Sequence, residues 1–228
     1  MTPMCILGTA INLVPSNGLG FDAFSACPEQ GLYALCDGAN SCPNSGQAAL
    51  WLSKQITQAK VHGDQPLNFE PLIFDLHQDM LQSFPNTAAT LVGLHVAPRM
   101  IRLVSVGDSE LTLYQRSWWG WGPWQKRCTM PKDLDATGNP RQLIASEVLD
   151  AVHQHDLPAQ GTWLALLMSD GPARVLPISS LNKTLHKVSK QIPSPEDLSY
   201  LCQTLAQEAL SSGCQDDISV AMVWFRYG

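Results

Sequence analysis

The chain has 228 residues, of which 45% are hydrophobic and 15% are charged, a composition that fits a single compact domain over 1–228. The 14 Lys and Arg against 20 Asp and Glu give a net charge of -6, which argues against a nucleic-acid partner and against attraction to anionic lipid. No run approaches the roughly 20 apolar residues of a membrane-spanning helix, and the first 12 residues lack the features of a signal peptide, so we expect no membrane association and a cytoplasmic location.

In chain order, the first clear pattern predicts a β-hairpin over 22–36. A strand that opens at Asp22 and a strand that ends at Cys36 flank the turn 28–31, and Asp37 follows directly. Antiparallel pairing about this turn brings the two outer ends together. Asp22 and Asp37 are therefore expected at the same end of a sheet.

Two helices and more sheet are expected next. Asn44 or Ser45 can cap a helix with apolar positions 49, 52, 56 and 59, and a second helix is expected over 67–83. From 88 to 115 apolar and polar residues alternate, with breaks near 98–99 and 107–108. This alternation predicts an antiparallel meander.

The stretch 117–126 is rich in Trp, Gly and Pro and is expected to form an ordered surface loop. Its tryptophans fit either a partner-binding surface or a plug at the end of a sheet sandwich; they are Trp118, Trp119, Trp121 and Trp124. After the loop we expect a helix over 141–153, a buried strand over 163–168 and a turn at 169–171.

The most complete helix signal lies near the end of the sequence. Ser194 supplies an N-cap, a proline and two acidic residues follow it, and Gly213 ends the helix. Asp216 and Asp217 then precede an alternating strand over 218–224.

Aspartates recur at the ends of the expected strands. They are Asp22, Asp37, Asp108, Asp170 and Asp216. A single one of them is explained equally well as a turn or cap residue. Together they suit Mg²⁺ or Mn²⁺, because these hard cations prefer carboxylate, carbonyl and water oxygens and relieve the repulsion between packed carboxylates. The set predicts a site for divalent metal at one end of a sheet core.

Five motifs in order make the sequence resemble the metal-dependent protein phosphatase 2C family over nearly the whole chain: FDAF, ALCDG, VSVGDSELTLY, LALLMSDG and DDISVAMV. The resemblance implies an α+β fold, a four-layer αββα sandwich of two antiparallel sheets flanked by helix pairs. It implies a phosphoprotein phosphatase that hydrolyses phosphoserine or phosphothreonine by attack of a water or hydroxide bridging two Mg²⁺ or Mn²⁺ ions. The partner it implies is a phosphorylated protein.

The resemblance also implies roles for individual residues. Asp37 bridges both ions, the carbonyl of Gly38 ligates one, and Asp170 and Asp216 ligate the other. Asp22 acts through a metal-bound water, so Asp22 and Asp37 are the expected catalytic residues. Asp108, with Asp170, is similar to the pair that holds a third, weaker metal in some bacterial relatives.

Three departures from the family pattern fall on the substrate side of the site. Asn17 stands where the family usually has a phosphate-clamping arginine, with Phe21 just before the first aspartate. Residues 39–41 replace a usual histidine and paired glycines, which removes a candidate general acid. Glu110 stands where a cation is usual. Asn17 is the expected substrate-binding position.

The alternative function is a pseudophosphatase, a metal-binding or partner-binding module without turnover, which the missing arginine favours. Other chemistries fit less well. The sequence has no C-x5-R loop, and the D-x-D-x-T match at 133–137 lacks the buried strand that must precede it in haloacid-dehalogenase-like phosphatases. The GDS at 107–109 lies too far along the chain for a GDSL-type esterase.

Overall fold

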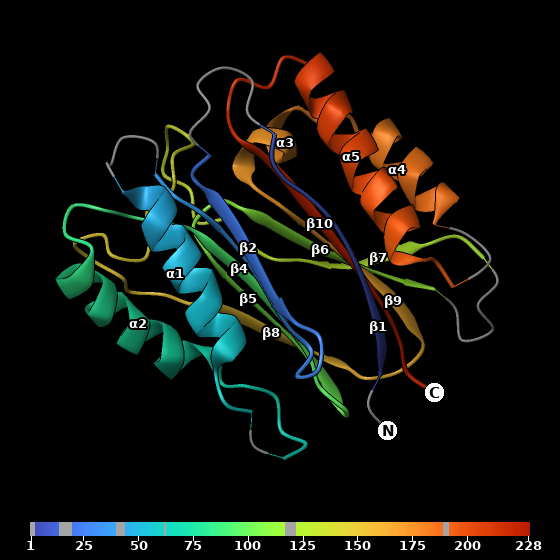
Figure 1. The fold of residues 1–228 in the computed structure, drawn as a ribbon, viewed down its shortest axis with the longest axis horizontal. Coiled ribbons are helices and arrows are strands. Elements are labelled where there is room, and N and C mark those ends of the chain that lie inside the picture. The colour runs from blue at the N-terminus through green and yellow to red at the C-terminus, as the bar shows by residue number, and fades with distance from the viewer. Residues whose placement is uncertain (1–2, 14–19, 40–43, 62, 117–121, 189–191) are drawn as a thin grey trace.

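The computed structural model of the chain describes residues 3–13, 20–39, 44–61, 63–116, 122–188 and 192–228. These residues form an α+β fold in which two five-stranded antiparallel sheets pack face to face between helices (Figure 1). The predicted αββα sandwich is confirmed.

Each sheet gathers strands from distant parts of the sequence. Sheet A has the order β1 (Met4–Leu13), β10 (Ile218–Arg226), β9 (Thr162–Met168), β6 (Glu110–Arg116) and β7 (Gln125–Thr129). Sheet B has the order β2 (Asp22–Cys27), β3 (Leu32–Asp37), β4 (Leu91–Val96), β5 (Met100–Val106) and β8 (His153–Pro158). Helices α1 (Ser45–Gln58) and α2 (Phe69–Ser83) cover sheet B, whereas α4 (Ile178–Lys187) and α5 (Pro195–Ser211) cover sheet A. The short helix α3 (Asp170–Val175) follows β9.

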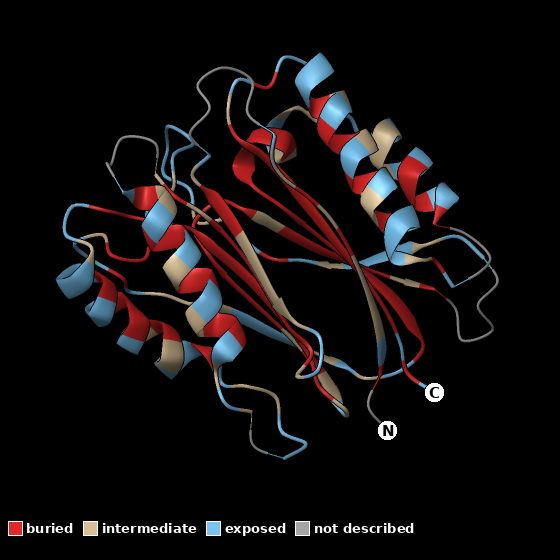
Figure 2. Ribbon diagram, in the orientation of Figure 1, coloured by how far each residue is buried: buried red, intermediate tan, exposed pale blue. Residues whose placement is uncertain are grey.

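Three apolar layers hold the sandwich together (Figure 2). Leu35 and Phe225 are fully buried between the sheets, Cys36 is buried between sheet B and its helices, and Leu205 is buried between sheet A and α5. Leu35 and Cys36 face opposite layers because successive side chains of a strand point to opposite faces. Strands buried on both faces explain why the central strands are apolar almost throughout.

The predicted hairpin is confirmed, and its register matters for the site. Strands β2 and β3 pair antiparallel with Asp22 opposite Asp37 and Cys27 opposite Leu32. The turn ends at Gly31, whose φ of 69° favours glycine. The two aspartates therefore lie side by side at one end of sheet B.

Three of the four predicted helices are confirmed with small shifts in their bounds. The helix expected over 67–83 begins at Phe69, and α1 begins directly after Asn44 although the Asn44 side chain makes no capping bond. Helix α5 has the full capping box: Asp197 N–H donates to Ser194 Oγ at 3.1 Å, and Ser194 N–H donates to Asp197 Oδ2 at 2.9 Å.

The meander expected over 88–115 is wrong in its last step. Strands β4 and β5 pair in sheet B, but β6 pairs with β7 and β9 in sheet A. The chain crosses between the sheets at Gly107, which has a φ of 87°, a left-handed conformation that favours glycine. Alternation of apolar and polar residues indicates a strand, but it does not indicate which sheet the strand joins.

The helix expected over 141–153 is also wrong, because tertiary contacts take up its backbone. Ile144 exchanges two hydrogen bonds with Ala89, of 2.9 and 3.1 Å, and Ala145 N–H donates to His77 Nδ1 at 3.0 Å. Ala145 has a φ of 67°, which no helix contains. His153, expected near a helix end, instead begins strand β8.

Several elements were not expected from the sequence, namely β1, β7, β8, α4 and α3, the last of which begins within the turn expected at 169–171. Three of the four loop tryptophans, Trp118, Trp119 and Trp121, lie outside the described residues. Trp124 is half-buried; its Nε1–H donates to the Val188 carbonyl at 2.9 Å, and the Arg116 guanidinium lies 4.9 Å from its ring centre. A partner surface formed by this loop stays a prediction.

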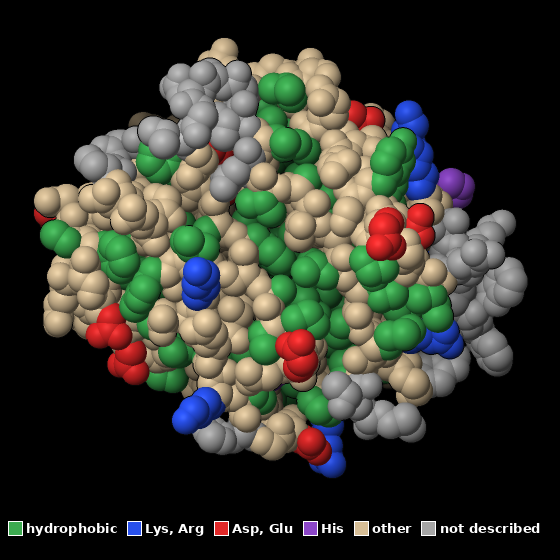
Figure 3. All heavy atoms as spheres, in the orientation of Figure 1, with side chains coloured by type: hydrophobic (Ala, Val, Ile, Leu, Met, Phe, Trp, Pro, Cys, Tyr) green, Lys and Arg blue, Asp and Glu red, His purple; other side chains and the backbone are tan. Residues whose placement is uncertain are grey.

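On the face shown in Figure 3, hydrophobic side chains form a strip between the two helical layers, and the described charged side chains are scattered. No helix formed by the described residues is long and apolar enough to cross a membrane.

His95 is a buried, neutral side chain of β4 that should make stability depend on pH. It is 1% exposed, and its Nδ1 accepts the Leu67 N–H at 2.8 Å. Burial lowers the pKa of His95 to about 4, so protonation costs folding free energy as pH falls from about 6.5 towards 4. We expect a loss of about 2 kcal/mol between pH 7 and pH 5 that His95→Gln lacks.

Urea unfolding of both proteins at the two pH values, with a chelator present, measures this difference. Carboxylates that titrate in the same range contribute equally to both proteins and cancel in the comparison. An equal change in wild type and His95→Gln would show that protonation of His95 does not oppose folding.

Candidate functional site

A cavity of about 130 Å³ lies where strands of both sheets end. Four of the aspartates and one glycine singled out by the sequence line it: Asp37, Gly38, Asp108, Asp170 and Asp216. Sequence positions up to 179 residues apart (37 to 216) therefore meet in one small space.

Different elements bring these residues to the cavity. Asp37 ends β3 in sheet B, whereas Asp170 begins α3 after β9 and Asp216 precedes β10, both in sheet A. Gly38 allows α1 to approach, because a Cβ there would lie 2.6 Å from the Ser45 carbonyl oxygen. Pro140 and Leu143 also line the cavity, and Leu143 lies in the segment 141–153 that was wrongly predicted as a helix.

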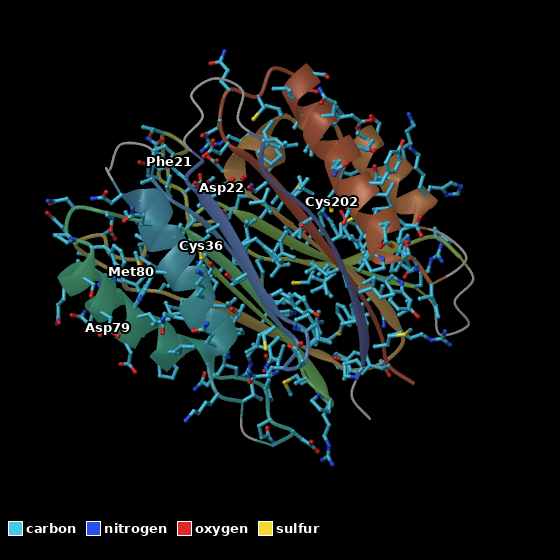
Figure 4. All side chains as sticks on the ribbon, viewed as in Figure 1. Phe21, Asp22, Cys36, Asp79, Met80 and Cys202 are labelled. Atoms are coloured by element: carbon cyan, nitrogen blue, oxygen red, sulfur yellow. The ribbon has the colours of Figure 1, made fainter. Side chains whose placement is uncertain are left out.

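Asp22 lies beside the cavity and is 3% exposed. Figure 4 shows it with Phe21 at the end of β2. Burial raises the pKa of Asp22 to about 6, against the opposing effect of hydrogen bonds with Ser219 and Ser169. Asp22 is thus a carboxyl group whose ionisation the fold makes costly.

The neighbouring carboxylates oppose one another's ionisation in the same way. Burial raises the pKa of Asp37 well above its usual range, and the charges of Asp22 and Asp170 raise it further. Burial also raises the pKa of Asp170, with Asp108 as the next cause. A positive charge bound among these groups would relieve the repulsion.

Neither a protein-family model nor any curated protein matches the sequence. Solved structures do match. The Mycobacterium tuberculosis serine/threonine phosphatase PstP/Ppp superimposes with a TM-score of 0.73 over 100% of both chains, at 17% identity. Stp1, a serine/threonine phosphatase from Staphylococcus aureus, superimposes with a TM-score of 0.72 over 100% of this chain and 96% of its own, at 14% identity.

The catalytic domain of PstP in complex with two manganese ions superimposes with a TM-score of 0.71 over 99% of this chain and 100% of its own, at 16% identity. The fold is that of the bacterial serine/threonine phosphatases. The resemblance to the protein phosphatase 2C family is thereby confirmed at the level of the fold.

The cavity of this phosphatase fold offers donors that suit a hard divalent cation. Asp37, Asp170 and Asp216 provide carboxylates and Gly38 a carbonyl, all of them oxygen ligands. Within the described residues, however, no three His, Cys, Asp or Glu side chains have the arrangement of a preformed single-metal site. The donor chemistry fits Mg²⁺ or Mn²⁺, and the carboxylates surround the cavity without closing on one point.

Buried hydroxyl groups in and near the cavity wall hold the backbone around the aspartates in place. Asp37 N–H donates to Thr90 Oγ1 at 3.2 Å, and Thr90 Oγ1 lies 2.7 Å from Ser109 Oγ. Ser219 N–H donates to Ser169 Oγ at 3.1 Å, which joins β10 to the end of β9. The role of these serines and of the threonine could not be predicted from local sequence patterns, because it depends on neighbours far away in the chain.

Asp217 lies directly after Asp216, and the sequence alone does not distinguish the roles of the two residues. Its Oδ2 accepts the Phe21 N–H at 2.6 Å, and burial raises the pKa of its carboxyl group. Asp217 is 7% exposed, whereas Asp216 is half-buried and lines the cavity. One aspartate of the pair fixes the start of β2 and the other faces the cavity.

Two of the departures from the family pattern can be placed only in part. Asn17 and residues 40–41 lie outside the described residues, so the substrate-binding role predicted for Asn17 stays a prediction. Glu110 pairs with Lys132 at 3.3 Å, which balances its charge within the fold.

Proposed function

We propose that the chain is a metal-dependent phosphoprotein phosphatase acting on phosphoserine and phosphothreonine. The observation that carries the proposal is the meeting of Asp37, Asp170 and Asp216, from both sheets, around one cavity. A fold shared with bacterial serine/threonine phosphatases over nearly the whole chain supports it. A phosphorylated protein is the substrate that follows from this activity.

The residue roles belong to the same proposal. Asp37 would bridge two Mg²⁺ or Mn²⁺ ions, the Gly38 carbonyl would ligate one, and Asp170 and Asp216 would ligate the other. Asp22 would act through a water held by its carboxylate. Bound divalent ions supply Lewis-acid activation of water and neutralise charge on the phosphoryl oxygens.

The protein's own residues contribute orientation and a defined electrostatic field. Thr90 fixes the backbone of Asp37 through the 3.2 Å hydrogen bond, and the hydrogen bonds of Ser169 and Ser219 with Asp22 favour its charged form. Such preorganised groups need no rearrangement when the reaction begins. In this proposal Asp22 and Asp37 would orient a water molecule for attack in line with the leaving oxygen.

The second candidate is a pseudophosphatase that binds a metal or a partner without turnover. The observation that favours it is the open arrangement of the carboxylates. Among the described residues, no group of three His, Cys, Asp or Glu side chains has the geometry of a preformed site for one metal ion. Asn17, in place of the family's arginine, acts in the same direction.

Hydrolysis of para-nitrophenyl phosphate with Mn²⁺ and with chelator separates the two functions. We expect turnover with Mn²⁺, and we expect a chelator to abolish it. The control variant Asp64→Asn changes an exposed side chain and should leave the turnover unchanged. Phosphoserine, phosphothreonine and phosphotyrosine peptides then test the substrate class, with the first two expected to be hydrolysed. Metal binding without hydrolysis of any of these substrates would support the pseudophosphatase and contradict the enzyme.

A further inference from the structure

One cation lies among the carboxylates of the cavity. Among the described residues that line it, Arg174 alone carries a positive charge. Its Nη2 lies 2.9 Å from Asp108 Oδ2 and 2.8 Å from Asp170 Oδ2. The Arg174 side chain is 52% exposed, whereas Asp108 is 6% and Asp170 12% exposed at the side chain. Two nearly buried carboxylates thus hold an arginine that still reaches solvent.

The geometry leaves most of the guanidinium available. A guanidinium has five N–H groups, of which two are on Nη2. Both recorded ion pairs of Arg174 use Nη2, and no acceptor among the described residues is recorded for Nε or Nη1. The remaining N–H groups, on Nε and Nη1, point to different sides of the guanidinium, so each can donate separately to an anion.

Three other cations near the sheets form ion pairs away from the cavity's carboxylates. Arg102 makes two hydrogen bonds of 2.7 Å to Asp156, and Lys132 pairs with Glu110. Arg99 pairs with Asp64. Arg99 directly precedes β5, whereas Asp108 follows the opposite end of that strand. Arg174 is therefore the described cation placed to meet an anion inside the cavity.

We propose that Arg174 binds the phosphate dianion of the substrate through N–H groups that the two carboxylates leave unused, and that Asp108 positions the guanidinium. This inference rests on the proposed function. Nη2 occupies the space between Asp108 and Asp170, so a third ion bridging these carboxylates would have to displace it. In this chain a side chain supplies the positive charge at that position.

The orientation of the guanidinium depends on both carboxylates. Asp170 lies four residues before Arg174 in α3, so helix geometry brings these side chains together. Asp108 comes from the β5–β6 turn and fixes the guanidinium from the other side. Arg174→Lys keeps a charge but loses the planar guanidinium, whose separate nitrogens can bind the carboxylates and an anion at once. Asp108→Asn keeps the shape but loses the charge that holds the guanidinium.

The kinetic test uses an aryl phosphate with Mn²⁺ and compares wild type with four variants: Arg174→Met, Arg174→Lys, Asp108→Asn and the control Arg99→Met. We expect Arg174→Met to raise KM by about 10- to 100-fold, with a smaller effect on kcat. Arg174→Lys should recover part of the loss. Arg99→Met, which removes the same charge outside the cavity, should leave both constants unchanged.

Binding measurements give a readout that does not need turnover. Inorganic phosphate titrated into the Mg²⁺-loaded protein should bind at least about tenfold more weakly to Arg174→Met than to wild type. The number of Mn²⁺ ions bound without substrate, counted by electron paramagnetic resonance, should be equal in wild type and Asp108→Asn.

The outcomes separate this inference from the proposed function. Unchanged KM and phosphate affinity in Arg174→Met, with wild type active, would overturn the inference alone. A lower Mn²⁺ count in Asp108→Asn with unchanged KM would assign Asp108 to a third ion instead. If wild type lacks turnover, the proposed function fails, and the phosphate titration still decides whether Arg174 binds phosphate.

Discussion

Asp37→Asn is expected to reduce Mn²⁺-dependent hydrolysis by at least about a thousandfold while stabilising the metal-free protein. Burial raises the pKa of the Asp37 carboxyl group, and the negative charges of the neighbouring Asp22 and Asp170 raise it further. An amide in its place loses a bridging ligand, and it also removes the repulsion that the metal-free fold must sustain.

The sign of the stability effect follows from the raised pKa. A carboxyl group with a folded-state pKa above its unfolded value of about 3.9 favours folding when protonated and loses that contribution as pH rises. The stabilisation by Asp37→Asn should therefore be largest at neutral pH and disappear below about pH 4. Thermal unfolding with chelator at pH 4 and pH 7, beside Mn²⁺ kinetics, checks both parts. Wild-type turnover by Asp37→Asn at saturating Mn²⁺ is incompatible with a bridging role.

The adjacent Asp216 and Asp217 form a matched pair with opposite expected effects. Asp216→Ala should weaken Mn²⁺ binding about tenfold or more with little loss of fold, because Asp216 faces the cavity and water can replace its hydrogen bond. Asp217→Ala should cost about 1–3 kcal/mol of stability, because it removes the acceptor of the Phe21 N–H.

Asp217→Asn retains an acceptor oxygen and should recover much of that loss. Urea unfolding of the metal-free proteins and Mn²⁺ titration of the folded ones measure the two effects separately. Equal effects of Asp216→Ala and Asp217→Ala on both quantities would show that the pair does not divide its roles in this way.

Much of the fold follows from patterns that are local in the sequence. The hairpin at 22–37 and helix α5 were predictable because a turn and a capping box specify them within a few residues. The segment 141–152 was not, because Ala89 and His77, more than 50 residues away in sequence, take up its backbone hydrogen bonds. Tertiary contacts of this kind override local propensity.

The residues of the site also differ in whether local sequence patterns reveal them. Aspartates at strand ends are visible in the sequence because each follows or precedes an apolar run, as Asp37 and Asp170 do. Arg174 carried no such signal, since nothing local says that Asp108, 66 residues away, will contact it. Asp217 was hidden beside Asp216 because the burial that distinguishes them depends on the approach of Phe21.

The pairing of β1 with β10 has a consequence for how the chain folds. This ladder joins Met4 to Arg226, so sheet A can be completed only after most of the chain has been brought together. Closing so long a loop costs entropy before any contact is gained, and topologies of this kind fold slowly, in milliseconds to seconds. Hairpin β2–β3 can form early, whereas Asp216, at the start of β10, reaches its place late. We therefore expect the cavity to assemble in the last steps of folding.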